Sequence, residues 1–209
     1  GIYDNNEITI ISSGIGTDNI DILINELDAL VNIDLKTGEE KEEPLSLTLI
    51  RLGTSGGLRS DVPAGSFVVT ETAVGFDGLL HFYSGYDWIL DTLLSDLLAE
   101  YLEWPDTLCY PYAVKADEQL AGLFDTDKFI KGITISTPGF YGPQGRRLRL
   151  DCFDNEVNRK LSQFSLRGRK ICNYEMESSA IYGLSSLLGH KALTICAVIG
   201  NRVTGEFIT

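Results

Sequence analysis

The sequence predicts a single α/β sheet domain, and three observations carry this prediction. Apolar runs rich in β-branched residues alternate with amphipathic stretches of helical spacing along the chain. Several runs end in glycine-rich or polar segments, as strands do where an open α/β sheet binds its ligand. At 209 residues the chain can bury a sizeable core, and no repeat or domain boundary interrupts it. Residues 1–209 are therefore assigned to one domain.

The first elements resemble the start of a parallel α/β unit. Residues 7–16 form an apolar β-branched run that ends in glycines, and they predict a strand. Residues 17–31 predict a helix, because apolar side chains recur there at helical spacing after Thr17 or Asp18 as the N-cap. The charged stretch 36–44 predicts a surface loop.

The later elements continue the alternation of strands and helices. Residues 45–57 predict a buried strand that ends in a glycine-rich turn, and residues 86–104 predict one long amphipathic helix. The other strands are expected at 66–74, 132–140, 171–176 and 191–202, and the last helix at 177–190, with Gly189 and His190 marking its end.

Charge and composition exclude several classes of function. The net charge is −13, and the sequence pI is near 4.5. A negative field of this size repels nucleic acid and anionic membranes, so neither is expected as a partner. An anionic substrate would need a local cluster of cations. Four scattered cysteines and two histidines predict no metal site, with Cys172 and Cys196 as buried hydrophobes in a reducing compartment. No apolar run is as long as a membrane span and no signal peptide is visible, so a cytoplasmic location is expected.

The first candidate segment for chemistry is "IRLGTSGG", residues 50–57. Backbone N–H groups at glycines can converge on an anion, and the hydroxyls of Thr54 and Ser55 can add hydrogen bonds. Arg51 carries a permanent charge that suits phosphate. The alternative is a tight turn with an exposed arginine beside it.

The second candidate segment is "FYGPQGR". Phe140 offers a flat face for stacking, Gln144 offers both a donor and an acceptor, and Arg146 offers a fork of donors. This set suits an amide-like heterocycle such as uracil. The alternative is a solvated polar loop. The neighbouring Arg147 and Arg149 are expected to be solvated or paired with acidic residues.

The third candidate segment is "NYEMES", where a strand becomes a helix. Glu175 and Glu177 lie two apart, so on extended backbone they share a face. Near a helix N-terminus, acidic side chains are favourable for structural reasons alone. Two carboxylates around Met176 would equally suit a sugar, since they accept from hydroxyls while the thioether covers the ring. Spacing does not separate these two interpretations.

Together and in this order, the segments resemble the nucleoside phosphorylase superfamily, and within it the uridine phosphorylases. "RLGTSGGL" is similar to the family's phosphate and ribose segment, and "FYGPQGR" to its uracil-reading motif Phe-Tyr-x-x-Gln-x-Arg. "NYEMES" matches the ribose-binding Glu-Met-Glu signature, and "VIGNR" matches the closing strand that brings an arginine to the base. The resemblance implies a three-layer α/β/α fold with a central mixed sheet.

The resemblance implies a division of roles along the substrates. Arg51 and Thr54 would hold phosphate, and Glu177 with Met176 and Glu175 would bind the ribose hydroxyls. Four residues would act in catalysis itself: Arg51, Gln144, Arg146 and Glu177.

For the base, the resemblance implies a pocket from two segments. Phe140 would stack near sugar and base, while Gln144 and Arg146 would bond the carbonyls and N–H of uracil. Ile199 would line the pocket, and Arg202 would support the Arg146 side.

Two glycines bear on the choice of base. Gly56 would let the base approach the backbone. Gly200 stands where purine-specific relatives carry an aspartate, which favours uridine over purine nucleosides.

The activity implied is the reversible phosphorolysis of uridine to uracil and ribose 1-phosphate, with inorganic phosphate as co-substrate and without metal or cofactor. A homo-oligomer, dimer or hexamer, is also implied. The family begins with a further strand and a Gly-Asp-Pro phosphate loop and ends with a further helix, so the chain is expected to be incomplete at both ends. The alternatives are a non-catalytic nucleoside-binding protein or inactive fragment, and a phosphorylase for another nucleoside.

Overall fold

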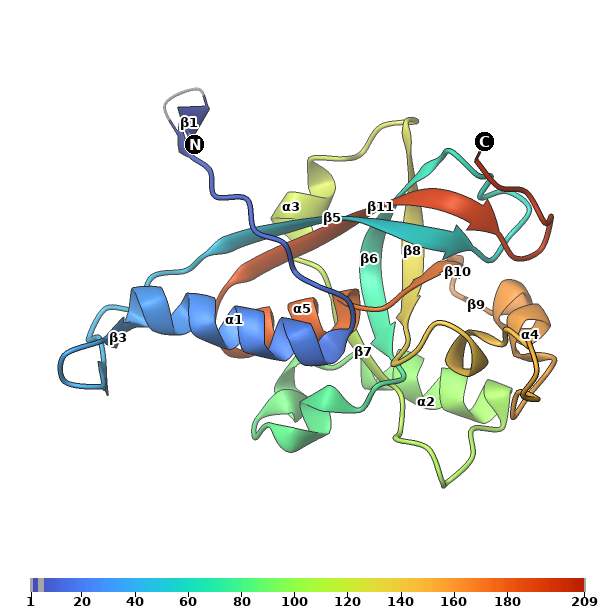
Figure 1. Ribbon diagram of the computed structural model, residues 1–209, viewed down its shortest axis with the longest axis horizontal. Coiled ribbons are helices and arrows are strands. Elements are labelled where there is room, and N and C mark those ends of the chain that lie inside the picture. The colour runs from blue at the N-terminus through green and yellow to red at the C-terminus, as the bar shows by residue number, and fades with distance from the viewer. Residues whose placement is uncertain (1, 4–5, 209) are drawn as a thin grey trace.

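A mixed seven-stranded sheet forms the centre of the computed structural model, which describes residues 2–3 and 6–208 (Figure 1). Its strands are β5 (Thr48–Gly57), β6 (Phe67–Gly75), β7 (Tyr112–Lys115), β8 (Phe129–Ser136), β9 (Ser165–Leu166), β10 (Arg169–Glu175) and β11 (Lys191–Asn201). Two short hairpins lie outside it, β1 (Ile2–Tyr3) with β2 (Asn6–Glu7), and β3 (Ile33–Asp34) with β4 (Glu39–Glu40).

The sheet combines parallel and antiparallel pairs, as expected from the family resemblance. Strands β5 and β11, β6 and β8, and β8 and β10 are parallel neighbours. Strand β5 runs antiparallel to β10, and β6 runs antiparallel to both β7 and β11. Because β11 pairs with β5 on one side and β6 on the other, five strands form a closed hydrogen-bonded circuit. The ends of β5, β10 and β11 thereby meet.

Helices cover the sheet on both faces. They are α1 (Thr17–Asn32), α2 (Thr92–Leu102), α3 (Glu118–Gly122), α4 (Val157–Gln163) and α5 (Ser178–Leu187), with short 3-10 turns at Leu79–Phe82, Tyr86–Ile89 and Gly142–Gln144. Ala73 belongs to the core under α1 and α5, whereas its neighbour Val74 belongs to the core under α2 and α4. Successive residues of a strand point to opposite faces, so these are two cores separated by the sheet.

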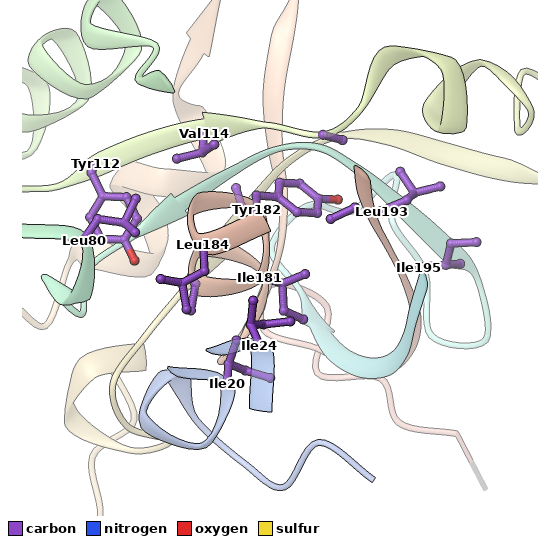
Figure 2. Packing of buried hydrophobic residues seen from close by; sticks show 14 of the residues in the cluster. Ile20, Ile24, Leu80, Tyr112, Val114, Ile181, Tyr182, Leu184, Leu193 and Ile195 are labelled. Carbon is purple, nitrogen blue, oxygen red and sulfur yellow. The ribbon is translucent and has the colours of Figure 1, made fainter. Parts of the chain in front are cut away.

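The larger core explains why α5 is buried almost all round. Ile181 and Leu184 on this helix pack with Ile20 and Ile24 of α1, and Tyr182 points towards the sheet near Leu193 (Figure 2). The Tyr182 hydroxyl donates to the Thr70 carbonyl at 2.7 Å and accepts from the Thr194 N–H at 2.8 Å. The helix is therefore held between α1 and the sheet.

The strand expected at 7–16 is wrong beyond Glu7. Residues 8–16 form no strand, and the side chains of Ile10 and Ile15 are 92% and 72% exposed. An apolar β-branched run favours extended backbone, but the pattern does not say whether a neighbouring strand pairs with it. The following helix is confirmed, although its N-cap is Gly16 without a side-chain cap, and not Thr17 or Asp18.

Three further expectations need correction. The glycines after Arg51 form no turn, because β5 continues to Gly57. The long helix expected at 86–104 is divided at Asp91, whose side chain accepts from the Leu94 N–H and so starts α2 as its N-cap. Strand β8 also ends at Ser136, earlier than expected. The short elements β7, β9, α3 and α4 were not expected from the pattern.

The strands expected at 66–74, 171–176 and 191–202 are confirmed, and so is the last helix. The strand expected at 45–57 begins at Thr48 and is not buried as expected, since Leu52 on it is 78% exposed. Cys172 and Cys196 are buried, as expected, and all four cysteines are free. Among the helices formed by described residues, none is both long and apolar enough to cross a bilayer.

Replacing Tyr182 by Phe tests the anchoring of α5. The variant leaves a buried N–H and a buried carbonyl without their partner, so we expect a loss of roughly 1–3 kcal/mol in the free energy of unfolding. Urea unfolding followed by circular dichroism measures this loss. Tyr141→Phe is the matched control, because that side chain is 49% exposed and its hydroxyl has no hydrogen-bond partner among the described residues. Equal midpoints for the two variants would contradict the anchoring role.

Candidate functional site

A cleft of about 830 Å³ opens where β5, β10 and β11 end beside the loop that follows β8. Its lining includes every residue that the sequence singled out: Arg51, Thr54, Gly56, Phe140, Gln144, Arg146, Glu175, Met176, Glu177, Ile199 and Arg202. Four segments of the chain are thus brought to one place. Arg147 lies outside the lining and pairs with Asp151, in line with the expectation for it.

Arg51 links the two glutamates at one end of the cleft. Its Nη1 lies 3.1 Å from Glu175 Oε2, and its Nη2 donates to Glu177 Oε2. All three side chains are largely buried, Arg51 being 12% exposed. Removing the arginine would leave two buried carboxylates without their cation, so Glu175 and Glu177 both depend on Arg51.

Glu175 has the structural role that its position near a helix start allows. Its carboxylate accepts the N–H groups of Glu177 and Ser178, each at 2.9 Å, and the hydroxyl of Ser136. With Arg51 as a fourth donor, the acceptor capacity of the carboxylate is filled. Glu175 therefore caps α5 and holds Arg51. Its carboxylate has little acceptor capacity left for the hydroxyls of a sugar.

Glu177 is the N-cap residue of α5, yet its side chain makes no capping bond. It turns instead to the cleft, where Oε1 accepts the Gly16 N–H at 2.7 Å and Oε2 accepts from Arg51. Each oxygen keeps a lone pair for a further donor. Burial raises the pKa of Glu177 above its ordinary value, and the nearby Arg51 acts against this shift.

The glycines of β5 make room for two guanidinium groups. A Cβ at Gly53 would lie 2.4 Å from Arg51 Nη1, and a Cβ at Gly56 would lie 3.1 Å from Arg202 Nε. Side chains at these positions would displace both arginines. The expected nest of backbone N–H groups is absent from this stretch, since residues 48–57 pair with β11 along their length.

The opposite end of the cleft is cationic. The guanidinium of Arg146 lies 4.2 Å from the ring centre of Phe140, and that of Arg202 lies 5.6 Å from it. Neither arginine has an ion-pair partner among the residues that the structure describes. Burial, and then the charge of Arg146, lower the pKa of Arg202. This end can therefore stabilise negative charge on a bound group.

Gln144 lies between these arginines and the sheet, with 1% of its surface exposed. Its Oε1 accepts from Arg202 Nη2 at 2.7 Å, and its Nε2 donates to the hydroxyl of Thr137 at 3.1 Å. One N–H and one lone pair of the amide remain without a partner in the described chain. Because Gln144 lines the cleft, these are the donor and the acceptor that its amide can offer to a bound group.

Three other polar atoms of residues that line the cleft are buried without a hydrogen-bond partner among the described residues. They are Ser55 Oγ, beside the exposed Thr54, the Tyr174 hydroxyl oxygen and Arg202 Nε. Buried polar groups are normally satisfied, so unpartnered ones in a cleft point to a ligand. Met176 is half-buried, and Ile199 is 40% exposed at the rim.

The sequence did not reveal three contributors to the cleft. Gly16 supplies the N–H that meets Glu177, and Thr137 holds Gln144. Phe207 packs so closely on Gly200 that a Cβ there would lie 2.7 Å from its ring. Gly16 acts through a contact with a distant segment, and Thr137 and Phe207 act through contacts seven residues along the chain, which no helix or strand period reports. In the described part of the chain, no three His, Cys, Asp or Glu side chains gather as a metal site would require.

Comparison with known proteins gives consistent results. The family model described as the phosphorylase superfamily matches residues 1–207. Uridine phosphorylase of Thermococcus kodakarensis is 30% identical over 207 residues, which are 99% of this chain and 62% of that protein. Guanosine phosphorylase of Halorubrum lacusprofundi is 27% identical over 205 residues, 98% of this chain and 65% of that one. The chain thus spans less than two thirds of the length of both relatives.

Among solved structures, a Trypanosoma brucei nucleoside phosphorylase described as showing uridine phosphorylase activity superposes with a TM-score of 0.77. It is 26% identical, and the match covers 95% of this chain and 72% of that one. The mixed sheet and flanking helices agree with this likeness.

Arg51→Met tests the mutual dependence of the three buried charges. It leaves two buried carboxylates without their cation, so we expect a loss of about 3–5 kcal/mol in the free energy of unfolding. Adding Glu177→Gln to Arg51→Met should recover part of that loss, because one buried charge is then removed.

Urea unfolding at neutral pH compares these variants. Arg147→Met is the control, since the Arg147–Asp151 pair is 63% and 72% exposed and should contribute about 0–1 kcal/mol. A double variant no more stable than Arg51→Met alone would argue against a charge-based dependence.

Proposed function

Because the chain belongs to the phosphorylase superfamily, we propose that it acts on uridine, which it splits reversibly with inorganic phosphate into uracil and ribose 1-phosphate. The names of its relatives and the Gln-x-Arg loop favour a uracil base. The guanosine phosphorylase among those relatives keeps a purine nucleoside as an alternative substrate to be tested.

The observation that carries the proposal is the order of groups along one cleft. Arg51 with the open hydroxyl of Thr54 lies at one end, and Glu177 with Met176 lies beside it. Two guanidiniums without ion-pair partners in the described chain lie at the other end, with the Gln144 amide. A nucleoside and phosphate present their groups in this same sequence: phosphate, sugar, base.

In the proposed reaction a phosphate oxygen forms a bond to C1′ of the ribose while the bond from C1′ to N1 of uracil breaks. The electron pair of that bond leaves with uracil, which becomes an anion and then takes a proton from water. Arg146 and Arg202 lie where this negative charge would develop, so their field lowers the barrier in the manner of an oxyanion hole. Nucleoside and phosphate bound side by side supply the reactants already positioned.

Glu177 has the geometry for the ribose. Each of its carboxylate oxygens already accepts one donor, from Gly16 or Arg51, and keeps a lone pair for a hydroxyl of the sugar. Its negative charge also lies near the carbon that becomes cationic as the bond breaks. Glu175 is assigned to support Glu177 and Arg51, with a smaller part in sugar binding than the resemblance implies.

One observation favours a second candidate, a protein that binds nucleosides without splitting them. The charge of Arg51 is matched by two carboxylates, so this end of the cleft carries no excess positive charge among the described residues. A dianion is not strongly attracted to such a group.

Homo-oligomeric assembly is also part of the proposal. Ile15 and Leu52 expose apolar surface at the edge of the cleft, and a second subunit could cover it.

The release of uracil from uridine, followed by ultraviolet absorbance with and without inorganic phosphate, tests the proposal. Phosphate-dependent release is expected, with ribose 1-phosphate as the second product. Retention of intact uridine under both conditions would favour the binding protein. Guanosine, inosine and thymidine assayed in parallel would reveal another preferred nucleoside.

Glu177→Gln should keep the fold and reduce kcat/KM for uridine by roughly 10- to 100-fold, the effect of losing a charged hydrogen-bond acceptor. The raised pKa of the wild-type carboxyl predicts that kcat/KM falls on the acid side, with its midpoint above the ordinary glutamate value. The variant should lack this acid limb. Glu39→Gln, in the distant β3–β4 hairpin, is the control. Wild-type rates for Glu177→Gln would contradict a part for Glu177 in the reaction and leave it a structural role.

A further inference from the structure

We propose that Thr137 is a positioning residue which, together with Arg202, holds the Gln144 amide in one of its two orientations and so makes the cleft select uracil over cytosine. This inference rests on the proposed function, because it concerns the base end of the same site. Thr137 itself contacts neither sugar nor phosphate in that scheme and acts through Gln144.

The backbone of this region is fixed on both sides. Thr137 is fully buried directly after β8, and its N–H donates to the Glu175 carbonyl at 3.0 Å. The Gln144 N–H donates to the Tyr141 carbonyl at 2.9 Å, and the Gln144 carbonyl accepts from Asn158 Nδ2 at 3.1 Å. The main freedom left to Gln144 is rotation of its terminal amide.

While the Thr137 hydroxyl donates its proton to the Gly139 carbonyl, it can act towards the Gln144 amide as an acceptor and not as a donor. Its single proton is donated to the Gly139 carbonyl at 3.0 Å, so a lone pair faces Gln144 Nε2 at 3.1 Å. At the other side, Arg202 Nη2 lies 2.7 Å from Gln144 Oε1. A guanidinium has donors and no acceptor, so a rotated amide would place its NH₂ group against Arg202. Both neighbours therefore favour the same orientation.

This orientation determines which base edge is read. The remaining lone pair of Oε1 requires an N–H, and the remaining N–H of Nε2 requires an acceptor next to it. Uracil offers that order, since its N3–H lies beside a carbonyl. Cytosine has an unprotonated N3 beside an amino group, which is the order that the rotated amide would read. Rejection by unpaired buried polar groups is the strongest form of discrimination available to a binding site.

The experiment compares Thr137→Val with Thr137→Ser. Val keeps the shape of the side chain and removes the hydroxyl, whereas Ser keeps the hydroxyl. The readout is the ratio of kcat/KM for uridine to kcat/KM for cytidine. A general distortion of the loop would lower both terms and leave the ratio unchanged, so the ratio separates positioning from mere structure. Thr137→Val should lower the ratio about tenfold, and Thr137→Ser should stay within about twofold of wild type.

Binding of free uracil and free cytosine, measured by calorimetry, gives the same comparison without turnover. Arg202→Met removes the other contact of the amide and should also weaken the preference, which keeps the test valid if Thr137→Val fails to fold. Unchanged ratios in Thr137→Val and Arg202→Met would overturn the inference.

The outcomes distinguish the two proposals. A wild-type protein that splits uridine while Thr137→Val keeps the full preference contradicts the inference alone. A wild-type protein that binds uracil over cytosine without phosphorolysis contradicts the proposed function alone, and the inference is then decided by the binding ratios. A wild-type protein that binds neither base contradicts both.

Discussion

The buried group of Arg51, Glu175 and Glu177 is the interaction on which the rest of the site depends. Through Glu175 it caps α5, and through Glu177 it reaches the N–H of Gly16 at the start of α1. Two helices and two strands therefore meet at one arginine on β5. A charge in the interior needs its partners in place. The same contacts that orient the candidate sugar-binding carboxylate thus also hold the layers of the fold together.

Short motifs predicted which residues line the cleft better than they predicted the secondary structure of the segments that carry them. "NYEMES" left open whether its glutamates cap a helix or bind a sugar. In the structure Glu175 caps the helix, and Glu177, whose oxygens each keep a lone pair, remains the candidate for the sugar. Sequence spacing shows that both share a face, but it does not show which one has its acceptors already filled. That answer depends on Ser136, from a different strand.

The failed predictions have two origins. The helix expected at 86–104 is divided by the local cap at Asp91, whereas the others concern how segments pair and pack in the fold. The apolar run 8–16 has the composition of a strand and lies outside the sheet, because pairing is a property of two segments. Gly53 was expected to form a turn, but it lies within β5. It is a glycine position because the Arg51 guanidinium occupies the space of a side chain there. Thr137 carries no motif at all. Helix periodicity, in contrast, is local, and α1 and α5 followed from it.

The contact between Gly200 and Phe207 restricts how this cleft could diverge over evolutionary time. A side chain at position 200 would meet the ring of Phe207, which is itself 68% exposed, so it would have to push that ring towards solvent. The two positions are therefore coupled, and we expect them to vary together among related sequences.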